Sequence, residues 1–569
     1  MNIVRARLHG NKISPILKHL GVFLLMIYLY VLILGYIGGI DSVFFYRQWV
    51  ELLLLSYFYI YSYTILKESS WRWLIAIIPV LASYLVQDVF YLFYGKVFRL
   101  IEILELPELV QVITLGYWFI IIVILILPLL LFVVSVNYRR WQAIVLGLLP
   151  LGFVIGMIVM SPTSYTSFLE KYAGGIVKYS DTKSAERNGR FAMLFYKEAE
   201  RLNALQLTDA YRDRASYEDK ISEKLGMLKQ VSNQKNVHLI VLESFLDPRL
   251  FKRMRFSQSP VHPEFKRLFN KKLGLSISSV FGGSTAQAEF EVLCGVPALE
   301  KLSSVEFNVF TGSAVYCMPG IMSRMGYQTI ATNAYKPNFF NALPAYKGLG
   351  FNEIYFPQEF TSTGSSYLSV GGVGDEDYLF DGKLFDQNLE FIANKLKDNN
   401  GAPIFNYMMT IYGHTPHILD KKLRPEIIKV QSDYADDHLQ RSTNQFYYRT
   451  QAIAKYVKEL IKLDKNSLII LVSDHVPPLR NGPNTYRKLD YMGNIENYYY
   501  YNRLMIIDNG KPVVYRDIRH FDMPDIVYNY LSDGGYCESQ PCTHLGKQPM
   551  LSRESFIDQY YSIMAHASE

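Results

Sequence analysis

Three long stretches without a charged side chain near the N-terminus constrain this chain more than any other feature. Residues 19–40, 109–138 and 141–169 contain no Asp, Glu, Lys or Arg. A helix needs about 20 apolar residues to cross the hydrocarbon core of a bilayer, and each stretch is at least that long. The sequence therefore predicts three transmembrane helices here.

Two further apolar stretches each carry one acidic residue. Residues 49–66 include Glu51 near one end, and residues 73–94 include Asp88. With these two, we expect a transmembrane domain of five helices in residues 1–161. An acidic residue inside a membrane is functional by default, but Asp88 near the outer end of its helix could instead face water, and both interpretations stay open.

The distribution of basic residues predicts the orientation in the membrane. If the N-terminus is cytoplasmic, the cytoplasmic segments carry eight Lys and Arg residues and the outer loops carry three. Lys and Arg favour the cytoplasmic side of membrane proteins. An odd number of spans then places everything after Ser161 outside the cytoplasm. We expect a multi-pass protein of the cytoplasmic (inner) membrane with a periplasmic or extracellular domain.

Overall composition agrees with this uneven arrangement. Hydrophobic residues make up 50% of the 569 residues, charged residues only 19%, and the mean hydropathy is +0.06. So many apolar and aromatic side chains exclude a disordered chain. The net charge of +6 comes without a run of basic residues, so a nucleic-acid partner is not expected.

All four cysteines follow the predicted membrane domain. They are Cys294, Cys317, Cys537 and Cys542, and four cysteines allow three pairings. The short spacing of the last two is compatible with a disulfide in an oxidising compartment. Cys294 and Cys317 would then form the other disulfide. Buried free thiols are the alternative.

The remainder of the chain is expected to have two parts. Residues 162–235 mix charged and apolar residues in patterns typical of amphipathic helices and form a connector. The pattern of residues 236–569 predicts one α/β domain with a mostly parallel sheet. Six short apolar runs are the expected strands, namely residues 237–243, 273–281, 327–335, 403–411, 467–475 and 503–508.

Potential metal ligands follow two of these runs. Glu243 ends the first, and Asp474 and His475 end the fifth. Ligands of parallel sheets bind beyond the carboxyl ends of the strands, and these residue types suit Mn²⁺, Mg²⁺ or Zn²⁺. The second run leads into a Gly-Gly turn and a helical pattern, where Ser284 or Thr285 could be a nucleophile that a metal activates.

A histidine motif follows the fourth run. His414 and His417 stand in the sequence YGHTPH, which places them at the same edge of the sheet. Taken singly, each of these elements is also compatible with a purely structural role.

The order of these motifs resembles a known family. ESF, GGSTAQAEFEVLCG, GHTPH and SDH follow one another as in the lipoteichoic acid synthase-like phosphoglycerol transferases of the alkaline phosphatase/sulfatase superfamily. A five-span membrane domain before the enzyme domain is also the architecture of that family. The resemblance covers essentially the whole chain and implies a sulfatase-like fold outside the cytoplasm.

The resemblance implies roles for particular residues. Glu243, Thr285, Asp474 and His475 would bind one divalent metal, usually Mn²⁺, with Zn²⁺ or Mg²⁺ as alternatives. The family's nucleophile lies four residues before a Glu-Phe pair, which here selects Thr285 over Ser284. His414 matches the family's catalytic and head-group-binding histidine, whereas His417 has no counterpart.

The predicted head-group pocket departs from the family pattern. Phe340 and Asn341 match an aromatic-Asn pair that binds substrate, but Ala342 stands where the family has arginine. Arginine is the usual bidentate ligand of a phosphate, so the identity of the head group stays open. Lys336 or Lys347 could supply the charge instead.

The activity implied is transfer of a phospholipid head group through a covalent Thr285 intermediate. Phosphatidylglycerol is the expected donor, an envelope glycan or glycolipid the acceptor. Transfer of phosphoethanolamine from phosphatidylethanolamine, a head-group hydrolase and a non-catalytic scaffold are the alternatives. A sulfatase is disfavoured, because the sequence at Cys317 matches the formylglycine motif only in part and has Ile321 in place of its arginine.

Overall fold

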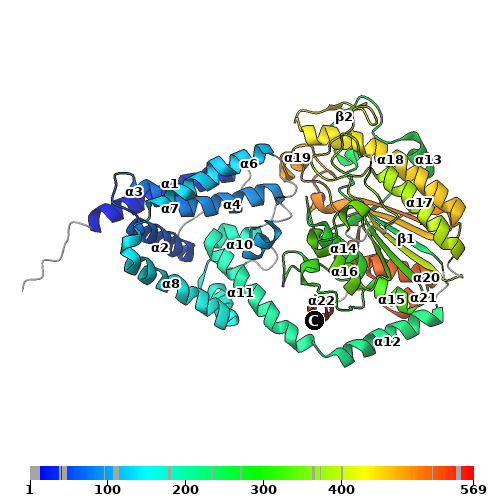
Figure 1. Cartoon of the computed structure of the whole chain (residues 1–569), viewed down its shortest axis with the longest axis horizontal. Helices are drawn as coiled ribbons and strands as arrows, with labels where there is room; N and C mark the ends of the chain where they lie inside the picture. The colour runs from blue at the N-terminus through cyan, green and yellow to red at the C-terminus, as the bar shows by residue number, and fades with distance from the viewer. Residues whose placement is uncertain are drawn as a thin grey trace, which may run out of the picture. The chain divides into compact units, whose positions relative to one another are not determined.

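The computed structural model shows two compact units, residues 1–204 and residues 205–569 (Figure 1). It describes residues 13–36, 40, 48–94, 97–106, 110, 115–176, 181–231, 235–269, 272–361, 366–371, 373–398, 401–515, 517–545 and 553–569. Parts of two predicted spans, residues 37–39 and 111–114, lie outside the described residues, as do the first basic residues used for the orientation.

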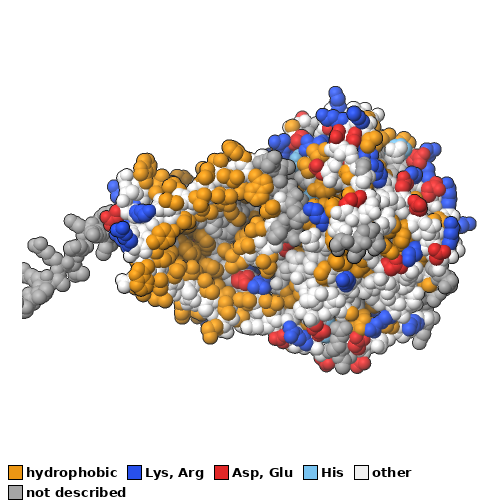
Figure 2. Space-filling view, in the orientation of Figure 1, with side chains coloured by type: hydrophobic (Ala, Val, Ile, Leu, Met, Phe, Trp, Pro, Cys, Tyr) orange, Lys and Arg blue, Asp and Glu red, His pale blue; other side chains and the backbone are white. Residues whose placement is uncertain are grey.

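The first unit contains the apolar helices that the sequence predicts. They are α1 (Ile13–Tyr36), α2 (Trp49–Ile65), α4 (Ile78–Tyr94), the continuous run of α6 (Leu115–Ile121), a π-helical turn (Ile122–Ile126) and α7 (Leu127–Ser135), and α8 (Trp141–Met160). Four described stretches are long and apolar enough to cross a membrane: Ile16–Tyr36, Arg72–Leu92, Trp118–Ser135 and Tyr138–Met160. The fifth expected span, α2, has 17 residues. Hydrophobic side chains cover most of this unit's visible face (Figure 2), as a lipid-facing surface requires.

Both acidic residues of these helices are buried and bonded. Asp88 on α4 pairs with Arg190 at 2.6 Å, and both side chains are 1% exposed. The expectation that Asp88 could face water is therefore wrong, because Arg190 neutralises it inside the unit. Glu51 on α2 accepts the backbone N–H groups of Arg190, Phe191 and Ala192 at 2.8–3.1 Å. A carboxylate at a helix N-terminus satisfies otherwise unpaired donors, so Glu51 of α2 and Asp88 of α4 together fix the start of α11 (Arg190–Thr208).

The predicted connector is helical. It contains α9 (Pro162–Tyr172), α10 (Asp181–Asn188), α11 (Arg190–Thr208) and α12 (Arg214–Val231). The first unit ends within α11, at Ala204, and α12 belongs to the second unit. The expected division of the chain at residues 161 and 235 stays a prediction.

The second unit is built on a nine-stranded mixed sheet, and all six predicted strands occur in it. Its order is β11-β3-β9-β8-β1-β6-β4-β5, with β10 paired to β9. The strands are β1 (Val237–Leu242), β3 (Gly274–Ile277), β4 (Gln328–Asn333), β5 (Glu353–Tyr355), β6 (Ile404–Met409), β8 (Leu468–Ser473), β9 (Tyr501–Asp508), β10 (Lys511–Val513) and β11 (Ile518–Arg519). The pairings β8-β1-β6-β4-β5 and β11-β3 are parallel. Only β9 runs against its neighbours β8, β3 and β10, so the sheet is mostly parallel, as predicted.

Helices cover both faces of the sheet (Figure 1). On one face, α17 (Asp381–Asp398) and α18 (Asp437–Leu463) bury apolar side chains such as Leu384, Phe446 and Ile453 against Ile240 and Leu471 of the central strands. On the other, α14 (Thr285–Cys294), α15 (Met318–Arg324), α16 (Ala342–Leu349) and α20 (Met523–Leu531) form the second layer. This burial stabilises the parallel centre of the sheet, whose strand ends carry the candidate site.

Candidate active site

Three predicted metal ligands meet at the carboxyl end of the two central strands. β1 and β8 are parallel neighbours in register, with Leu242 opposite Ser473. Glu243, Asp474 and His475 follow these strand ends directly, and one ligand atom of each lies within 4.8 Å of the others. Their side chains are 2%, 0% and 2% exposed, so the sheet places them together away from water.

Hydrogen bonds hold two of the predicted ligands, Asp474 and His475, in one orientation. Asp474 Oδ1 accepts the backbone N–H groups of Ser244 at 2.7 Å and of His475 at 2.6 Å. His475 Nδ1 lies 3.1 Å from the carbonyl oxygen of Val476, which requires a proton on Nδ1 and leaves a lone pair on Nε2. Such bonds fix the tautomer and orientation of metal-binding histidines.

The arrangement fits a divalent cation. Asp474 Oδ2 is buried and, in the part of the chain that the structure describes, accepts no hydrogen bond. Burial raises the pKa of Asp474 well above its usual range, and the nearby Glu243 carboxylate raises it further. A cation would neutralise both carboxylates and occupy the unused oxygen, and carboxylate oxygens with an imidazole nitrogen suit Mn²⁺ or Zn²⁺.

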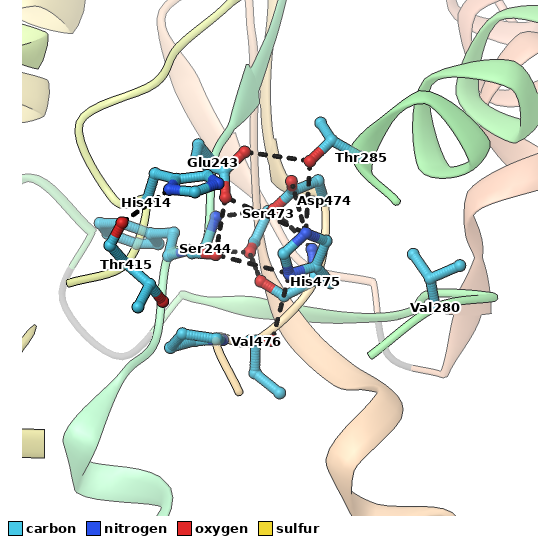
Figure 3. Close-up of polar contacts among 12 residues, drawn as sticks. Glu243, Ser244, Val280, Thr285, His414, Thr415, Ser473, Asp474, His475 and Val476 are labelled. Atoms are coloured by element: carbon cyan, nitrogen blue, oxygen red, sulfur yellow. Dashed lines mark hydrogen bonds and ion pairs between the residues drawn. The ribbon is translucent and has the colours of Figure 1, made fainter. Parts of the chain in front are cut away.

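Thr285 points into this group of ligands (Figure 3). It is the first residue of α14 and follows Ser284, whose φ of 61° makes the sharp turn before the helix. The Thr285 hydroxyl donates to Glu243 Oε2 at 3.0 Å and lies 3.3 Å from His475 Nε2. Unlike the three ligands, Thr285 is partly exposed. A hydroxyl beside a metal and open to solvent is a suitable nucleophile.

His414 lies on the opposite side of Glu243 from Thr285 (Figure 3). Its Nδ1 donates to the Thr415 carbonyl oxygen at 2.8 Å, which leaves Nε2 for a substrate. Gly413 brings this loop against the strand end: a Cβ here would overlap the Glu243 carbonyl oxygen and the Arg449 guanidinium, and stand 2.9 Å from the Glu243 carbonyl carbon. Only glycine permits this approach.

His417 does not share the role of His414. It is 1% exposed, and its Nδ1 lies 3.3 Å from Gln445 Oε1 on α18. Burial lowers the pKa of His417 well below its usual range, so it is a neutral interior residue.

A row of aromatic rings joins the predicted head-group residues to His414. Phe340 contacts Phe339 with ring centroids 4.6 Å apart, Phe339 contacts Tyr335 at 4.9 Å, Tyr335 contacts Tyr378 at 6.1 Å, and Tyr378 contacts His414 at 5.1 Å. The sequence reasoning missed Tyr335 and Tyr378, because neither belongs to a recognisable motif.

The other residues of the predicted head-group pocket make contacts within their own part of the fold. Asn341 donates its side-chain N–H groups to the carbonyl oxygens of Phe307 and Phe310, each at 2.7 Å. Ala342 is 3% exposed at the start of α16. Of the two lysines proposed to replace the absent arginine, Lys336 lies 5.4 Å from the Tyr335 ring centroid, within the aromatic row, whereas Lys347 is exposed on α16. The substrate-binding roles of Phe340 and Asn341 stay predictions.

Cys317 cannot serve as a formylglycine precursor here. It forms a disulfide with Cys294, the last residue of α14, and Cys537 pairs with Cys542. Both expected disulfides are therefore present. The same bond removes the thiol that the sulfatase alternative needs.

Glu289 is a further buried acid beneath Thr285. In the sequence it served only to locate Thr285, as part of the Glu-Phe pair. It lies one helical turn after Thr285, is 3% exposed, and accepts the hydroxyl groups of Tyr346 and of Tyr407 at 2.5 and 2.6 Å. Burial raises the pKa of Glu289 to about 7, against the effect of both tyrosine hydrogen bonds. These bonds tie α14 to α16 and β6.

A mostly parallel sheet with a hydroxyl and three metal-type ligands at its carboxyl edge defines a metal-dependent α/β enzyme of the alkaline phosphatase type. The sequence model of the sulfatase family matches residues 235–525, just over half of the chain. The chain belongs to the sulfatase family, which confirms the superfamily predicted from the motifs.

Two curated relatives match more distantly. A putative cyclic beta-1,2-glucan modification protein of Rhizobium meliloti strain 1021 is 24% identical over 264 residues, 46% of this chain and 38% of that protein. An uncharacterized protein of Haemophilus influenzae is 24% identical over 208 residues, 35% of this chain and 36% of that protein. The matches thus span little more than a third of the curated relatives.

Solved structures are similar in part. A Streptococcus pyogenes phosphoglycerol transferase, GacH, in complex with sn-glycerol-1-phosphate aligns with a TM-score of 0.47 and 18% identity, covering 62% of this chain and 91% of that chain. The lipoteichoic acid synthase LtaP of Listeria monocytogenes aligns at 0.43 and 17%, covering 55% and 78%. The family assignment rests on the sequence model rather than on these alignments.

Proposed function

We propose that this protein transfers a phosphorylated head group from a membrane phospholipid to a glycan or glycolipid through a covalent intermediate on Thr285. The observation that carries the proposal is the position of the Thr285 hydroxyl, which lies 3.0 Å from Glu243 Oε2 and 3.3 Å from His475 Nε2. Glu243, Asp474, His475 and Thr285 would hold one divalent metal, for which we expect Mn²⁺, with Zn²⁺ or Mg²⁺ as alternatives.

The reaction would proceed in two displacements at phosphorus. A bound divalent metal lowers the pKa of a coordinated hydroxyl and neutralises charge on the phosphoryl group. The Thr285 hydroxyl would release its proton to solvent, and its oxygen would form a bond to phosphorus as the phosphorus–oxygen bond to diacylglycerol breaks. The diacylglycerol oxygen takes up a proton, for which His414 Nε2 is the candidate donor.

The second displacement completes the transfer. An acceptor hydroxyl would give its proton to His414 Nε2 and bond to phosphorus, and the bond from phosphorus to Thr285 would break as Thr285 regains a proton from solvent. Membrane helices on the same chain raise the effective concentration of the lipid donor at the site. We place the catalytic unit on the periplasmic or extracellular side of the cytoplasmic membrane, because disulfides persist in oxidising compartments.

The donor that we propose is phosphatidylglycerol, which makes the protein a phosphoglycerol transferase. Phosphatidylethanolamine is the second candidate, because Ala342 at the position of the family's arginine leaves no guanidinium there to repel an ammonium group. A hydrolase would use water in the second displacement.

Intact-mass measurement of the full-length protein tests the proposal. The protein is incubated with Mn²⁺ and each phospholipid in turn, and with phosphatidylglycerol we expect a phosphoglycerol adduct that maps to Thr285 and is absent from Thr285→Ala. Ser284→Ala, one residue away, is the matched control and should still form the adduct. An adduct only from phosphatidylethanolamine would change the head group. No adduct from either lipid, or an adduct that persists in Thr285→Ala, would refute the enzyme proposed here.

A further inference from the structure

A run of four tyrosines, residues 498–501, has no part in the metal site. The first three form a 3-10 turn, η10 (Tyr498–Tyr500), directly before β9, and all three are partly exposed. Their rings contact in sequence, with centroids 5.1 Å apart between Tyr498 and Tyr499 and 4.6 Å apart between Tyr499 and Tyr500. Together with the partly buried Tyr434, they pack on a buried apolar cluster that includes Phe281 and Tyr486. We call Tyr434 and Tyr498–Tyr500 the tyrosine ledge.

The ledge contacts the loop that leads to Thr285. The ring of Tyr499 packs edge-on against Phe281 at 5.2 Å, and the Ser278 N–H donates to the Tyr500 carbonyl oxygen at 2.9 Å. Both contacts are on the loop that leads from β3 to Thr285. One residue after Phe281, the Gly282 N–H donates to the carbonyl oxygen of Val476 at 3.0 Å, and Val476 follows the ligand His475. The ledge therefore contacts the chain at Phe281, four residues before Thr285.

The ledge packs on apolar side chains beneath it, but most of the exposed side chains beside it are polar. Arg487, on α19 (Pro483–Lys488), interacts electrostatically with both Tyr434 and Tyr498. Asn494, Glu496 and Asn497 are exposed on the segment that enters η10. Aromatic rings with amide and guanidinium groups around them match a sugar ring, whose C–H face packs on an aromatic face while its hydroxyls need donors and acceptors.

A membrane surface fits the ledge less well. Helices and loops that enter a bilayer interface present bulky aliphatic or Trp side chains beside several Lys and Arg residues. In the described segment from Gly493 to Tyr500, Ile495 is the aliphatic side chain, 41% exposed, and the acidic Glu496 lies next to it; Arg487 is the basic residue that the electrostatics place beside the ledge.

We propose that the tyrosine ledge is the acceptor subsite, where the ring of a neutral glycan binds so that one of its hydroxyls reaches phosphorylated Thr285. The inference rests on the proposed function and names the acceptor chemistry of that same site. The glycan's O–H loses its proton, its oxygen bonds to phosphorus, and Thr285 leaves as the hydroxyl. Tyr498 is the ledge residue best suited to a test, because Phe281 contacts Tyr499 and not Tyr498 among the ring contacts of the described residues.

The experiment separates the two displacements in the full-length protein with Mn²⁺ and phosphatidylglycerol. Adduct formation on Thr285 is measured without acceptor, and transfer is then measured against the concentration of a neutral β-glucan oligosaccharide. For Tyr498→Ala we expect an unchanged rate of adduct formation and a rise of the KM for the glucan of about fivefold to tenfold, the loss of one ring contact. Tyr498→Phe keeps the ring and should stay within about twofold of the wild type.

Tyr448→Ala is the matched control. Tyr448 is a partly exposed tyrosine of the same unit, packed edge-on against Tyr447 at 5.5 Å, and its replacement should leave both readouts unchanged. An equal loss of adduct formation and transfer in Tyr498→Ala would show a merely structural role and overturn the inference. So would an unchanged KM for the glucan, or an equal rise in Tyr448→Ala.

Direct binding distinguishes failure of the inference from failure of the proposed function. If the wild type forms no adduct, the proposed function fails, and binding of the glucan measured by saturation-transfer NMR still tests the ledge. Binding that Tyr498→Ala weakens and Tyr498→Phe retains supports the subsite. No binding of the glucan to the wild type overturns it, as does a Tyr498→Ala protein that loses affinity for phosphatidylglycerol vesicles instead of the glucan.

Discussion

Replacing Asp474 by asparagine isolates the charge of one proposed metal ligand. Asp474 Oδ1 accepts two backbone N–H groups, and Oδ2 points toward His475 Nε2 at 3.2 Å. Asparagine keeps Oδ1 and both of its hydrogen bonds and changes only Oδ2 to an NH₂ group. The folded geometry is therefore preserved, while the anionic ligand is lost.

The magnitude follows from binding linkage. A ligand at 100 times its Kd stabilises the folded state by about 2.7 kcal/mol. We expect Mn²⁺ at that excess to raise the free energy of unfolding of the wild type by about 2.7 kcal/mol, and to leave Asp474→Asn almost unchanged. Without metal, the variant should be at least as stable as the wild type, because a buried carboxylate close to Glu243 is removed.

Thermal unfolding of the full-length protein in detergent, after chelation and after Mn²⁺ addition, provides the assay. Asp386→Asn is the matched control, since Asp386 pairs with Lys455 on the surface, where both side chains are more than half exposed. This control should keep the full Mn²⁺ effect. A full Mn²⁺ effect in Asp474→Asn would refute the assignment of Asp474 as a ligand. A metal-free variant much less stable than the metal-free wild type would refute the electrostatic reasoning.

Three further experiments test the structure around the site. Gly413→Ala should slow adduct formation by about 100-fold, the usual cost of a displacement near 1 Å at an active site. Equal rates in wild type and Gly413→Ala would contradict the packing argument. By contrast, Gly226→Ala, in an open part of α12, should raise the free energy of unfolding by about 0.5–1 kcal/mol. The raised pKa of Glu289, about 7 against an ordinary 4.5, contributes stability that is complete below pH 4.5 and is lost as pH rises through 7, so Glu289→Gln should gain up to about 3 kcal/mol relative to wild type over that range. Parallel pH profiles of the denaturation midpoint would show that Glu289 keeps an ordinary pKa. Joint replacement of Cys294 and Cys317 by alanine should lower the free energy of unfolding by about 3 kcal/mol, and an unchanged denaturation midpoint would rule out that contribution.

The fold was largely predictable because its signals are local. Apolar runs long enough for a bilayer predicted the helices of the first unit, and six short apolar runs predicted strands of the sheet. The direction of β9 was not predictable, because an apolar run has the same composition whether the strand is parallel or antiparallel. The partner of Asp88 was equally hidden, since Arg190 lies 102 residues away in the chain.

The candidate site divides in the same way. Glu243, Asp474 and His475 could be predicted together, because the carboxyl ends of parallel strands meet at one edge of a sheet. Residues such as Tyr378 could not, because they reach the site from loops whose course depends on packing.

By itself, the sequence determined that the chain has a membrane part and an α/β enzyme part, and which strand ends carry the residues Glu243, Asp474 and His475 that could bind a metal. Hydrophobic length and residue order suffice for both, since they act over a few neighbouring residues. Only the tertiary structure decided that Asp88 is neutralised by Arg190, that Cys317 is bound in a disulfide, and that Tyr499 packs against Phe281 on the loop that leads to Thr285. Such contacts join segments that are distant in the chain, and their geometry is set by the packing of the whole unit.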